Sequence, residues 1–216
     1  MIKGVIFDLD GTLLHTLPDL HDSINATLRN FGYPEISEID TLHFICHGAR
    51  DFVFKSLPQD AKDNVEVCLA FFGEYYEKSG SPRTALFDGI DGVLKKLAEQ
   101  GVKLGIVTNK PQRNAEDVYR RYLSAYPFTY VTGQVEGVDV KPDPTLTLQC
   151  IKAFGLEKQQ VVFVGDGETD VQTAINAGIQ GIAVTWGYRQ KSDLKKAGAV
   201  HFADTPEMLL DMICSL

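Results

Sequence analysis

Two carboxylates stand where a hydrophobic strand would be expected to continue. The segment VIFDLDGTLL (residues 5–14) opens with three apolar residues typical of a buried strand and then places Asp8 and Asp10 in line with them. Burying a carboxylate is costly unless a cation or hydrogen bonds compensate its charge. Side chains two positions apart on an extended chain point to the same side. We therefore expect the two aspartates to act together at a compensated, functional position.

Further along the chain, other polar residues that could take part in chemistry follow apolar runs or precede a predicted helix. In an open parallel sheet, active-site groups collect at the carboxyl ends of the strands. The residues at such positions are Thr108, Asn109, Lys110, Lys141, Asp166 and Asp170. We expect several carboxylates, a hydroxyl and a lysine to converge on one edge of the sheet.

This set of groups is suited to phosphoryl transfer. A hard cation such as Mg²⁺ prefers carboxylate oxygens, which Asp8 and Asp166 could supply, and it would offset the repulsion between a phosphate and its nucleophile. Asp8 could also be the nucleophile and form an aspartyl-phosphate, and Asp10 could then protonate the leaving group. Lys141 and Thr108 could hold the transferring phosphoryl oxygens.

Three further residues are predicted to contact the substrate. Gly11 leaves room for a ligand near the backbone. Asn109 lies beside Thr108 in the same predicted loop. Arg50 carries a guanidinium, which suits a substrate carboxylate or a second phosphate, although a solvated surface arginine is an open alternative.

Short apolar runs separated by helical patterns predict the fold that must position these residues. The runs are continuous rather than alternating, which is typical of parallel strands covered on both faces. They span residues 5–7, 104–107, 161–164 and 182–184, with a weaker run at 130–131. Helical patterns lie between and after them, at residues 89–100, 143–153, 169–177 and from Thr205 onward. This alternation predicts an α/β fold with a doubly wound, Rossmann-like parallel sheet.

One segment interrupts the alternation. No convincing strand is found there, and helical patterns cover residues 19–31, 39–45, 50–57 and 61–76. We predict an all-helical insert over residues 17–81 within an α/β domain formed by residues 1–16 and 82–216. The segments 14–17 and 78–83 are the predicted hinges.

Charge and composition restrict the classes of partner. The chain has 216 residues and a formal net charge of −8, and its Lys and Arg residues form no run longer than a pair, so no nucleic-acid partner is expected. No apolar run approaches the ~20 residues of a membrane span, and no signal peptide is recognised. The four cysteines, at positions 46, 68, 150 and 214, lack metal-binding spacing and are interpreted as reduced thiols. We expect a cytoplasmic protein with a small-molecule substrate, either a monomer or a homodimer.

Four motifs in order resemble those of the haloacid dehalogenase-like superfamily, over essentially the whole chain. They are DLDGT (8–12), VTN (107–109), KP (141–142) and GDGETD (165–170). The helical insert resembles the small cap domain that closes over the site in one subgroup. Residues 10–34, GARDFV (48–53) and VTNKP (107–111) most resemble phosphoglycolate phosphatases. His15 and Gly167 depart from the pattern, because the family usually has an acid at the first position and often has Ser or Thr at the second.

The resemblance implies a role for each residue of the predicted site. Asp8 would be the nucleophile and would bind Mg²⁺, and Asp10 would be the general acid/base and would bind Mg²⁺ through its backbone carbonyl. Asp166 would bind Mg²⁺ directly, and Asp170 would support the Mg²⁺ site from behind Asp166. Thr108 and Lys141 would hold the phosphate. The implied activity is that of a Mg²⁺-dependent phosphatase acting on a small phosphate ester, with 2-phosphoglycolate as the leading substrate.

Alternative interpretations remain open. A sugar-phosphate mutase or a pyrophosphatase of the same superfamily is the nearest alternative enzyme. A phospho-aspartate switch would share the sheet, the aspartate and Mg²⁺, but it would lack the helical insert and an acid placed like Asp10. Without the other motifs, Asp8 and Asp10 could be turn residues, Thr108 and Asn109 could cap a helix, and Lys141 could be solvated.

Overall fold

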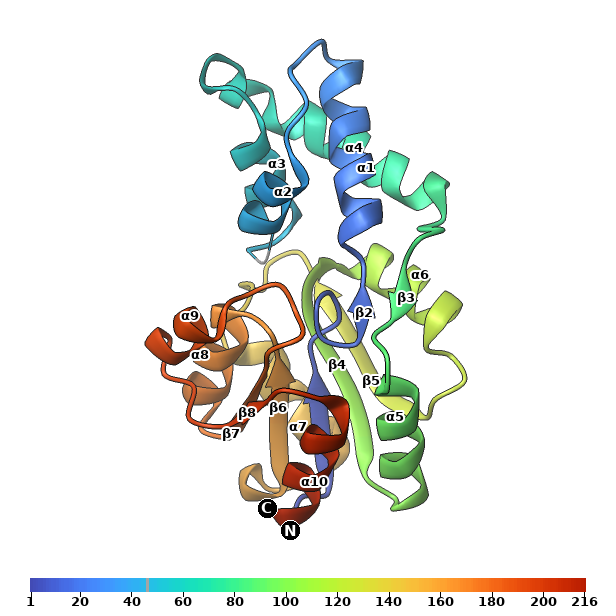
Figure 1. Cartoon of the computed structure of the whole chain (residues 1–216), viewed down its shortest axis with the longest axis vertical. Helices are drawn as coiled ribbons and strands as arrows, with labels where there is room; N and C mark the ends of the chain where they lie inside the picture. The colour runs from blue at the N-terminus through green and yellow to red at the C-terminus, as the bar shows by residue number, and fades with distance from the viewer. Residues whose placement is uncertain (46) are drawn as a thin grey trace.

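A six-stranded parallel sheet forms the centre of the molecule, and helices cover both of its faces (Figure 1). The computed structural model describes residues 1–45 and 47–216. The order of the strands across the sheet is β5 (Phe128–Gln134), β4 (Lys103–Pro111), β1 (Gly4–Phe7), β6 (Val161–Gly165), β7 (Gln180–Val184) and β8 (Phe202–Ala203). The predicted α/β fold with a doubly wound parallel sheet is confirmed.

The central strand explains why the apolar runs are continuous. All four residues of β1 are buried, because Val5 and Phe7 pack into the hydrophobic cluster on one face while Ile6 packs into the cluster on the other. The register pairs Phe7 with Ile106 of β4 and with Val164 of β6. Strands β1 and β6 therefore end at nearly the same level, while β4 continues past them to Pro111, so the residues after β1 and β6 and the last residues of β4 share one edge of the sheet.

Two groups of helices cover the sheet. One face carries α5 (Ile90–Glu99), α6 (Gln112–Tyr122) and α10 (Pro206–Ser215), whose buried residues join the cluster of Val5 and Phe7. The other face carries α7 (Thr145–Phe154), α8 (Glu168–Ala177) and α9 (Lys191–Lys196). Gly155 and Gly178 end α7 and α8 in the left-handed conformation that glycine adopts readily.

The insert is helical and stands beyond the carboxyl edge of the sheet (Figure 1). It contains α1 (Leu17–Asn30), α2 (Glu38–Phe44), α3 (Ala49–Ser56), a 3₁₀ turn at Gln59–Asn64, and α4 (Val65–Ser79). The two connections to the core meet in a short antiparallel pair, β2 (Leu14–His15) and β3 (Ala85–Leu86). Buried Asp19 of α1 joins the connections, since it accepts hydrogen bonds from the Arg83 backbone and, at 2.7 Å, from the Thr84 hydroxyl.

Some elements differ from the sequence-based expectation. The single helix predicted at residues 61–76 is divided into the 3₁₀ turn and α4, and a second 3₁₀ turn at Lys158–Gln160 precedes β6. Strands β2, β3 and β8 were not predicted, because two residues give no recognisable periodicity. The limits of the two domains, at residues 16/17 and 81/82, stay a prediction.

The described cysteines are not joined in disulfides. Cys68 and Cys150 are buried, Cys214 is exposed, and all three are free, whereas Cys46 lies outside the described residues. Within the part of the chain that the structure describes, no helix has both the length and the apolarity needed to cross a membrane.

Candidate active site

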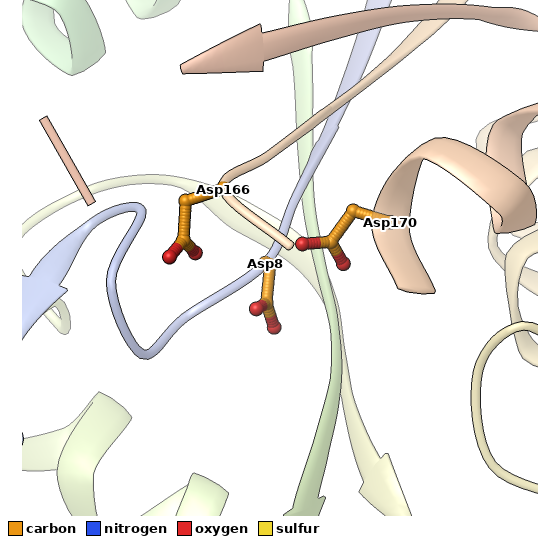
Figure 2. A group of neighbouring side chains, drawn as sticks. All are labelled: Asp8, Asp166 and Asp170. Atoms are coloured by element: carbon orange, nitrogen blue, oxygen red, sulfur yellow. The ribbon is translucent and has the colours of Figure 1, made fainter. Parts of the chain in front are cut away.

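Three of the predicted carboxylates meet at the carboxyl edge of the sheet. Asp8 follows β1 directly, Asp166 follows β6, and Asp170 lies in the first turn of α8. One carboxylate oxygen from each lies within 4.8 Å of the others (Figure 2). Asp166 and Asp170 are buried and Asp8 is half-buried, so this cluster concentrates negative charge in a region of low dielectric constant.

Neutral donors orient the Asp166 carboxylate. The Thr12 hydroxyl donates a hydrogen bond to its Oδ1 at 2.9 Å, and the backbone N–H of Tyr188 donates to its Oδ2 at 2.7 Å. A Cβ atom built at Gly11, where φ is +85°, would lie 2.4 Å from Oδ2, and one at Gly187 would lie 2.5 Å from it. Gly11, predicted to leave room for a ligand, thus leaves room for Asp166.

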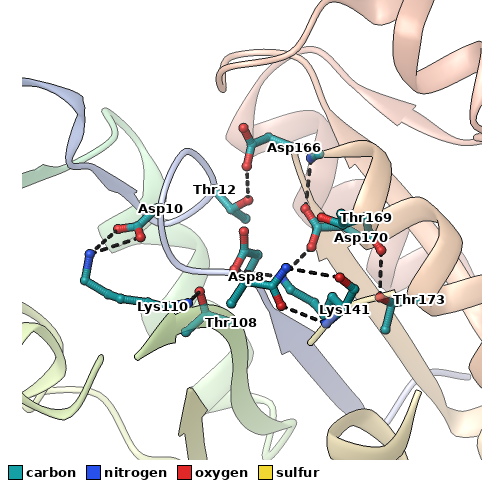
Figure 3. A network of polar contacts seen from close by, with 12 residues as sticks. Asp8, Asp10, Thr12, Thr108, Lys110, Lys141, Asp166, Thr169, Asp170 and Thr173 are labelled. Carbon is teal, nitrogen blue, oxygen red and sulfur yellow. Dashed lines mark hydrogen bonds and ion pairs between the residues drawn. The ribbon is translucent and has the colours of Figure 1, made fainter. Parts of the chain in front are cut away.

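Lys141 lies between the other two carboxylates. Its ammonium is 2.9 Å from Asp8 Oδ1 and 2.6 Å from Asp170 Oδ1 (Figure 3). The second oxygen of Asp170 accepts a hydrogen bond from the Gly167 backbone at 2.9 Å. Asn109 holds the backbone of Lys141, because its side chain accepts from the Lys141 N–H at 2.7 Å and donates to the Lys141 carbonyl at 3.2 Å. This contact gives Asn109 a positioning role that the sequence did not indicate.

The charges in the cluster change the pKa of its members. Burial, followed by the charges of Asp170 and Asp8, raises the pKa of Asp166 to about 8. Burial also raises the pKa of Asp170 to about 6, against the opposing effect of Lys141. Burial alone would lower the pKa of Lys141, but Asp170 and Asp8 outweigh it and raise that pKa above its ordinary value. The carboxylates therefore outnumber the positive charge that compensates them.

A hard divalent cation fits this donor set. All three groups offer carboxylate oxygens, the ligands that Mg²⁺ prefers. Asp8 Oδ1 is buried and accepts no hydrogen bond from any described residue, although Lys141 is within ion-pair distance. An ion placed here would satisfy that oxygen and reduce the repulsion among the carboxylates.

Asp10 lies apart from the carboxylate cluster. Its two oxygens are 3.1 and 3.0 Å from the ammonium of Lys110, which lies near the end of β4 (Figure 3). Thr108, two residues earlier on the same strand, is buried beside this pair and accepts a hydrogen bond from the Lys110 backbone at 3.4 Å. No role was predicted for Lys110, and the only signal for it was its place directly after Thr108 and Asn109.

Many of these groups line a cavity between the sheet and the helical insert, although Asp166 and Asp170 are not among its described lining residues. From the core it is lined by Asp8, Asp10, Thr108, Asn109, Lys110, Pro111, Asn114, Lys141 and Tyr188, and from the insert by Leu20, Ile45, Gly48, Ala49, Phe52, Phe72 and Tyr76. Arg50 is not among these described lining residues. It lies on the surface of the insert, where its Nε is 2.7 Å from Glu66 Oε1. The structure therefore does not bring Arg50 together with the other predicted substrate-binding residues.

The loop between β7 and α9 contributes contacts that sequence reasoning missed. The Tyr188 hydroxyl accepts hydrogen bonds from the backbone N–H groups of Thr16 and Leu17, at 2.8 and 2.9 Å, where the chain enters the insert. Arg189 donates to the carbonyls of Leu42 and Ile45 at the end of α2, each at 2.6 Å. These partners are backbone atoms far away in the sequence, so no residue pattern indicated them.

The doubly wound sheet, with carboxylates and a lysine at its carboxyl edge, defines an α/β enzyme suited to an anionic substrate. The model of the family "Haloacid dehalogenase-like hydrolase" matches residues 5–184. A phosphoglycolate phosphatase of Vibrio cholerae is 31% identical over 98% of this chain and 97% of its own. A phosphoglycolate phosphatase of Rhodospirillum rubrum is 33% identical over 88% of this chain and 83% of its own.

Solved structures with the same fold agree with the family match. A protein from Lactobacillus delbrueckii superposes with a TM-score of 0.90 at 30% identity, with 98% of each chain covered. A haloacid dehalogenase-like family hydrolase from Streptococcus pneumoniae shares the fold with a TM-score of 0.88 at 24% identity, again over 98% of each chain. The chain belongs to the haloacid dehalogenase-like hydrolases. The predicted family, and the predicted class of enzyme, a phosphatase of that family, are confirmed.

Proposed function

We propose that this protein is a Mg²⁺-dependent phosphatase that hydrolyses a small phosphate monoester through an aspartyl-phosphate on Asp8. The meeting of Asp8, Asp166 and Asp170 at one edge of the sheet, with Lys141 between Asp8 and Asp170, carries this proposal. The two relatives named as phosphoglycolate phosphatases, at 31% and 33% identity, support 2-phosphoglycolate as the first substrate to test. A cytoplasmic location is part of the same proposal.

Asp8 and Asp10 would carry the covalent steps. A carboxylate oxygen of Asp8 attacks the phosphorus atom, the bond to the leaving-group oxygen breaks, and Asp10 gives that oxygen a proton. A water molecule then attacks the same phosphorus atom, Asp10 takes a proton from it, and inorganic phosphate leaves Asp8 free again.

The other residues would hold charge in place. Mg²⁺ bound by Asp8, Asp166 and the Asp10 backbone carbonyl would offset the negative charge of the phosphoryl group. Lys141 and Thr108 would bind the phosphoryl oxygens, and Lys141 would be held by Asn109 and Asp170. Asp170 is already paired with the Lys141 ammonium at 2.6 Å, whereas Asp166 accepts hydrogen bonds from neutral donors only, so we assign Asp170 to Lys141 and Asp166 to the ion.

The cap domain, residues 17–81, would exclude water while the aspartyl-phosphate forms and would open to release product. The connections at residues 14–17 and 78–83 would be the hinges. The hydrogen bonds of Asp19 to Arg83 and Thr84 lie beside these hinges and would keep the two connections together during the motion.

Release of inorganic phosphate from a panel of small phosphate esters tests the proposal. We expect hydrolysis with Mg²⁺, no hydrolysis after chelation, and a loss of at least ~10³-fold in kcat for Asp8→Asn, because a nucleophile cannot be replaced by its neighbours. Asp193→Asn is the matched control, since Asp193 is paired with Lys196 on the surface of α9. Activity retained by Asp8→Asn would contradict the proposal, and a phosphoryl group recovered on a second organic product would indicate a mutase.

A further inference from the structure

One buried cation in the cavity has no role in the proposed chemistry at phosphorus. The lining contributed by the insert is apolar or aromatic, apart from Gly48: Leu20, Ile45, Ala49, Phe52, Phe72 and Tyr76. Among the described residues that line the cavity, the cations are Lys141 and Lys110. Lys141 is already in contact with Asp8 and Asp170. Lys110 is the cation left to act on the remainder of the substrate.

Lys110 lies between the general acid and the cap. Its side chain is only 4% exposed, and its ammonium is 3.0 Å from Asp10 Oδ2. The same ammonium lies over the ring of Tyr76 from α4, 4.5 Å from the ring centroid. An ammonium donates three hydrogen bonds and accepts none, so it can bind Asp10 and a further anion together.

The position of Asp10 determines where the leaving group must lie. To take a proton from Asp10, the leaving-group oxygen must come within hydrogen-bond distance of that carboxylate. The atoms attached to this oxygen then lie next to the Lys110 ammonium. Little water screens a buried charge, so an ammonium in this position attracts a second anion much more strongly than an exposed one does.

We infer that Lys110 is a specificity-determining residue that binds a negative charge on the leaving group. The inference rests on the proposed function and narrows its substrate class to phosphate esters or anhydrides whose leaving group is itself anionic. Two sources of that charge share the required chemistry: a carboxylate, as in 2-phosphoglycolate, and a second phosphate, as in pyrophosphate.

Steady-state kinetics with three substrates test the inference. They are 2-phosphoglycolate, pyrophosphate and 2-hydroxyethyl phosphate, which has a neutral hydroxymethyl group where 2-phosphoglycolate has its carboxylate. We expect the wild-type protein to prefer at least one anionic substrate over the neutral ester by about 10-fold or more in kcat/KM. Losing a hydrogen bond between charged groups costs about 1.5–3 kcal/mol, so Lys110→Met should reduce that preference by about 10- to 100-fold, chiefly through KM.

Lys103→Met is the matched control. Lys103 begins the same strand, and its ammonium donates to the Phe154 carbonyl at the opposite end of the sheet. We expect this variant to keep the wild-type preference. If Lys110→Met loses the preference for 2-phosphoglycolate, the bound charge is a carboxylate. If it loses the preference for pyrophosphate, the bound charge is a phosphate.

Several outcomes would overturn the inference. Equal wild-type kcat/KM values for the anionic and neutral substrates would overturn it. This measurement needs no variant, so it tests the inference even if Lys110→Met fails to fold. An equal loss on all three substrates in Lys110→Met, expressed in kcat, would assign Lys110 to positioning Asp10 alone. Both results are compatible with the proposed phosphatase function. If no phosphate ester were hydrolysed at all, the proposed function would be overturned as well.

Discussion

At the scale of single residues, the surroundings of Asp166 disfavour a negative charge. It is 1% exposed and accepts hydrogen bonds from two neutral donors, while the ammonium of Lys141 contacts Asp8 and Asp170. Burial and its like-charged neighbours raise the pKa of Asp166 to about 8. A proton or a cation is therefore needed to stabilise this carboxylate, and the two should compete.

The pKa of Asp166 predicts how stability depends on pH. Between the unfolded-state pKa, ~3.9, and the folded-state value of about 8, the folded protein binds more protons than the unfolded chain. The free energy of unfolding of the metal-free protein should therefore fall as the pH rises through this window. Without Mg²⁺, we expect a Tm several degrees higher at pH 6 than at pH 8.5. Adding Mg²⁺ should raise the Tm more at pH 8.5 than at pH 6.

Asp166→Asn provides the control for this experiment, because an amide has no charge to lose or gain across the range. Scanning calorimetry of the variant should show less dependence of Tm on both pH and Mg²⁺. A metal-free wild-type protein that is more stable at pH 8.5 than at pH 6 would contradict the assignment.

Among the elements, the loop between β7 and α9 links the carboxylate cluster at the edge of the sheet to the insert. The Tyr188 N–H binds Asp166, and its hydroxyl binds the backbone at Thr16 and Leu17. Arg189 donates to the last carbonyls of α2 and lies 3.2 Å from Glu168 at the start of α8. Carbonyls at the end of a helix lack partners within it, so the half-buried guanidinium of Arg189 satisfies them well.

This contact predicts different results for two arginines that both join the core to the insert. Arg189→Met should lower kcat/KM for phosphate release by about 10- to 100-fold, since about 1.5–3 kcal/mol is typical of hydrogen bonds to charged groups. Arg113→Met removes an ion pair between α6 and Glu77 of α4, and the Arg113 side chain is 79% exposed, so little change is expected. Equal losses in the two variants would show that the α2 contact has no special effect.

At the scale of the whole molecule, core and insert share one hydrophobic cluster. It extends from Val5 and Phe7 in the sheet through Leu13, Leu14 and Leu17 to Leu28 and Phe72 in the insert. Continuous burial of this kind couples the unfolding of the two parts, because exposing one of them removes contacts from the other.

We therefore expect a single cooperative unfolding transition, in which calorimetric and van't Hoff enthalpies agree. Leu28→Ala in α1 and Leu97→Ala in α5 each empty a fully buried site and should cost about 2–5 kcal/mol. Both variants should lower the same transition. A separate, earlier transition in Leu28→Ala alone would show that the insert unfolds independently.

Local patterns in the sequence were sufficient for the fold class and most of the sheet, but not for helices α6 and α9 or for the two-residue strands. The continuous runs at residues 5–7 and 161–164, together with the glycines that end α7 and α8, predict buried parallel strands and their helices. Because parallel strands end at one edge, the same patterns also predict that Asp8 and Asp166 lie close together. These properties depend on residues near one another in the chain, or on a general rule of parallel sheets.

The partner of each charged side chain was decided only by the tertiary structure. Nothing in the sequence indicated that Lys110 binds Asp10, that Asp170 accepts two hydrogen bonds, or that Arg50 turns to Glu66. Contacts of this kind depend on strand register, on the direction in which each side chain leaves the backbone, and on the packing that excludes other rotamers. Those quantities are set when the whole chain is packed, so no short segment contains them.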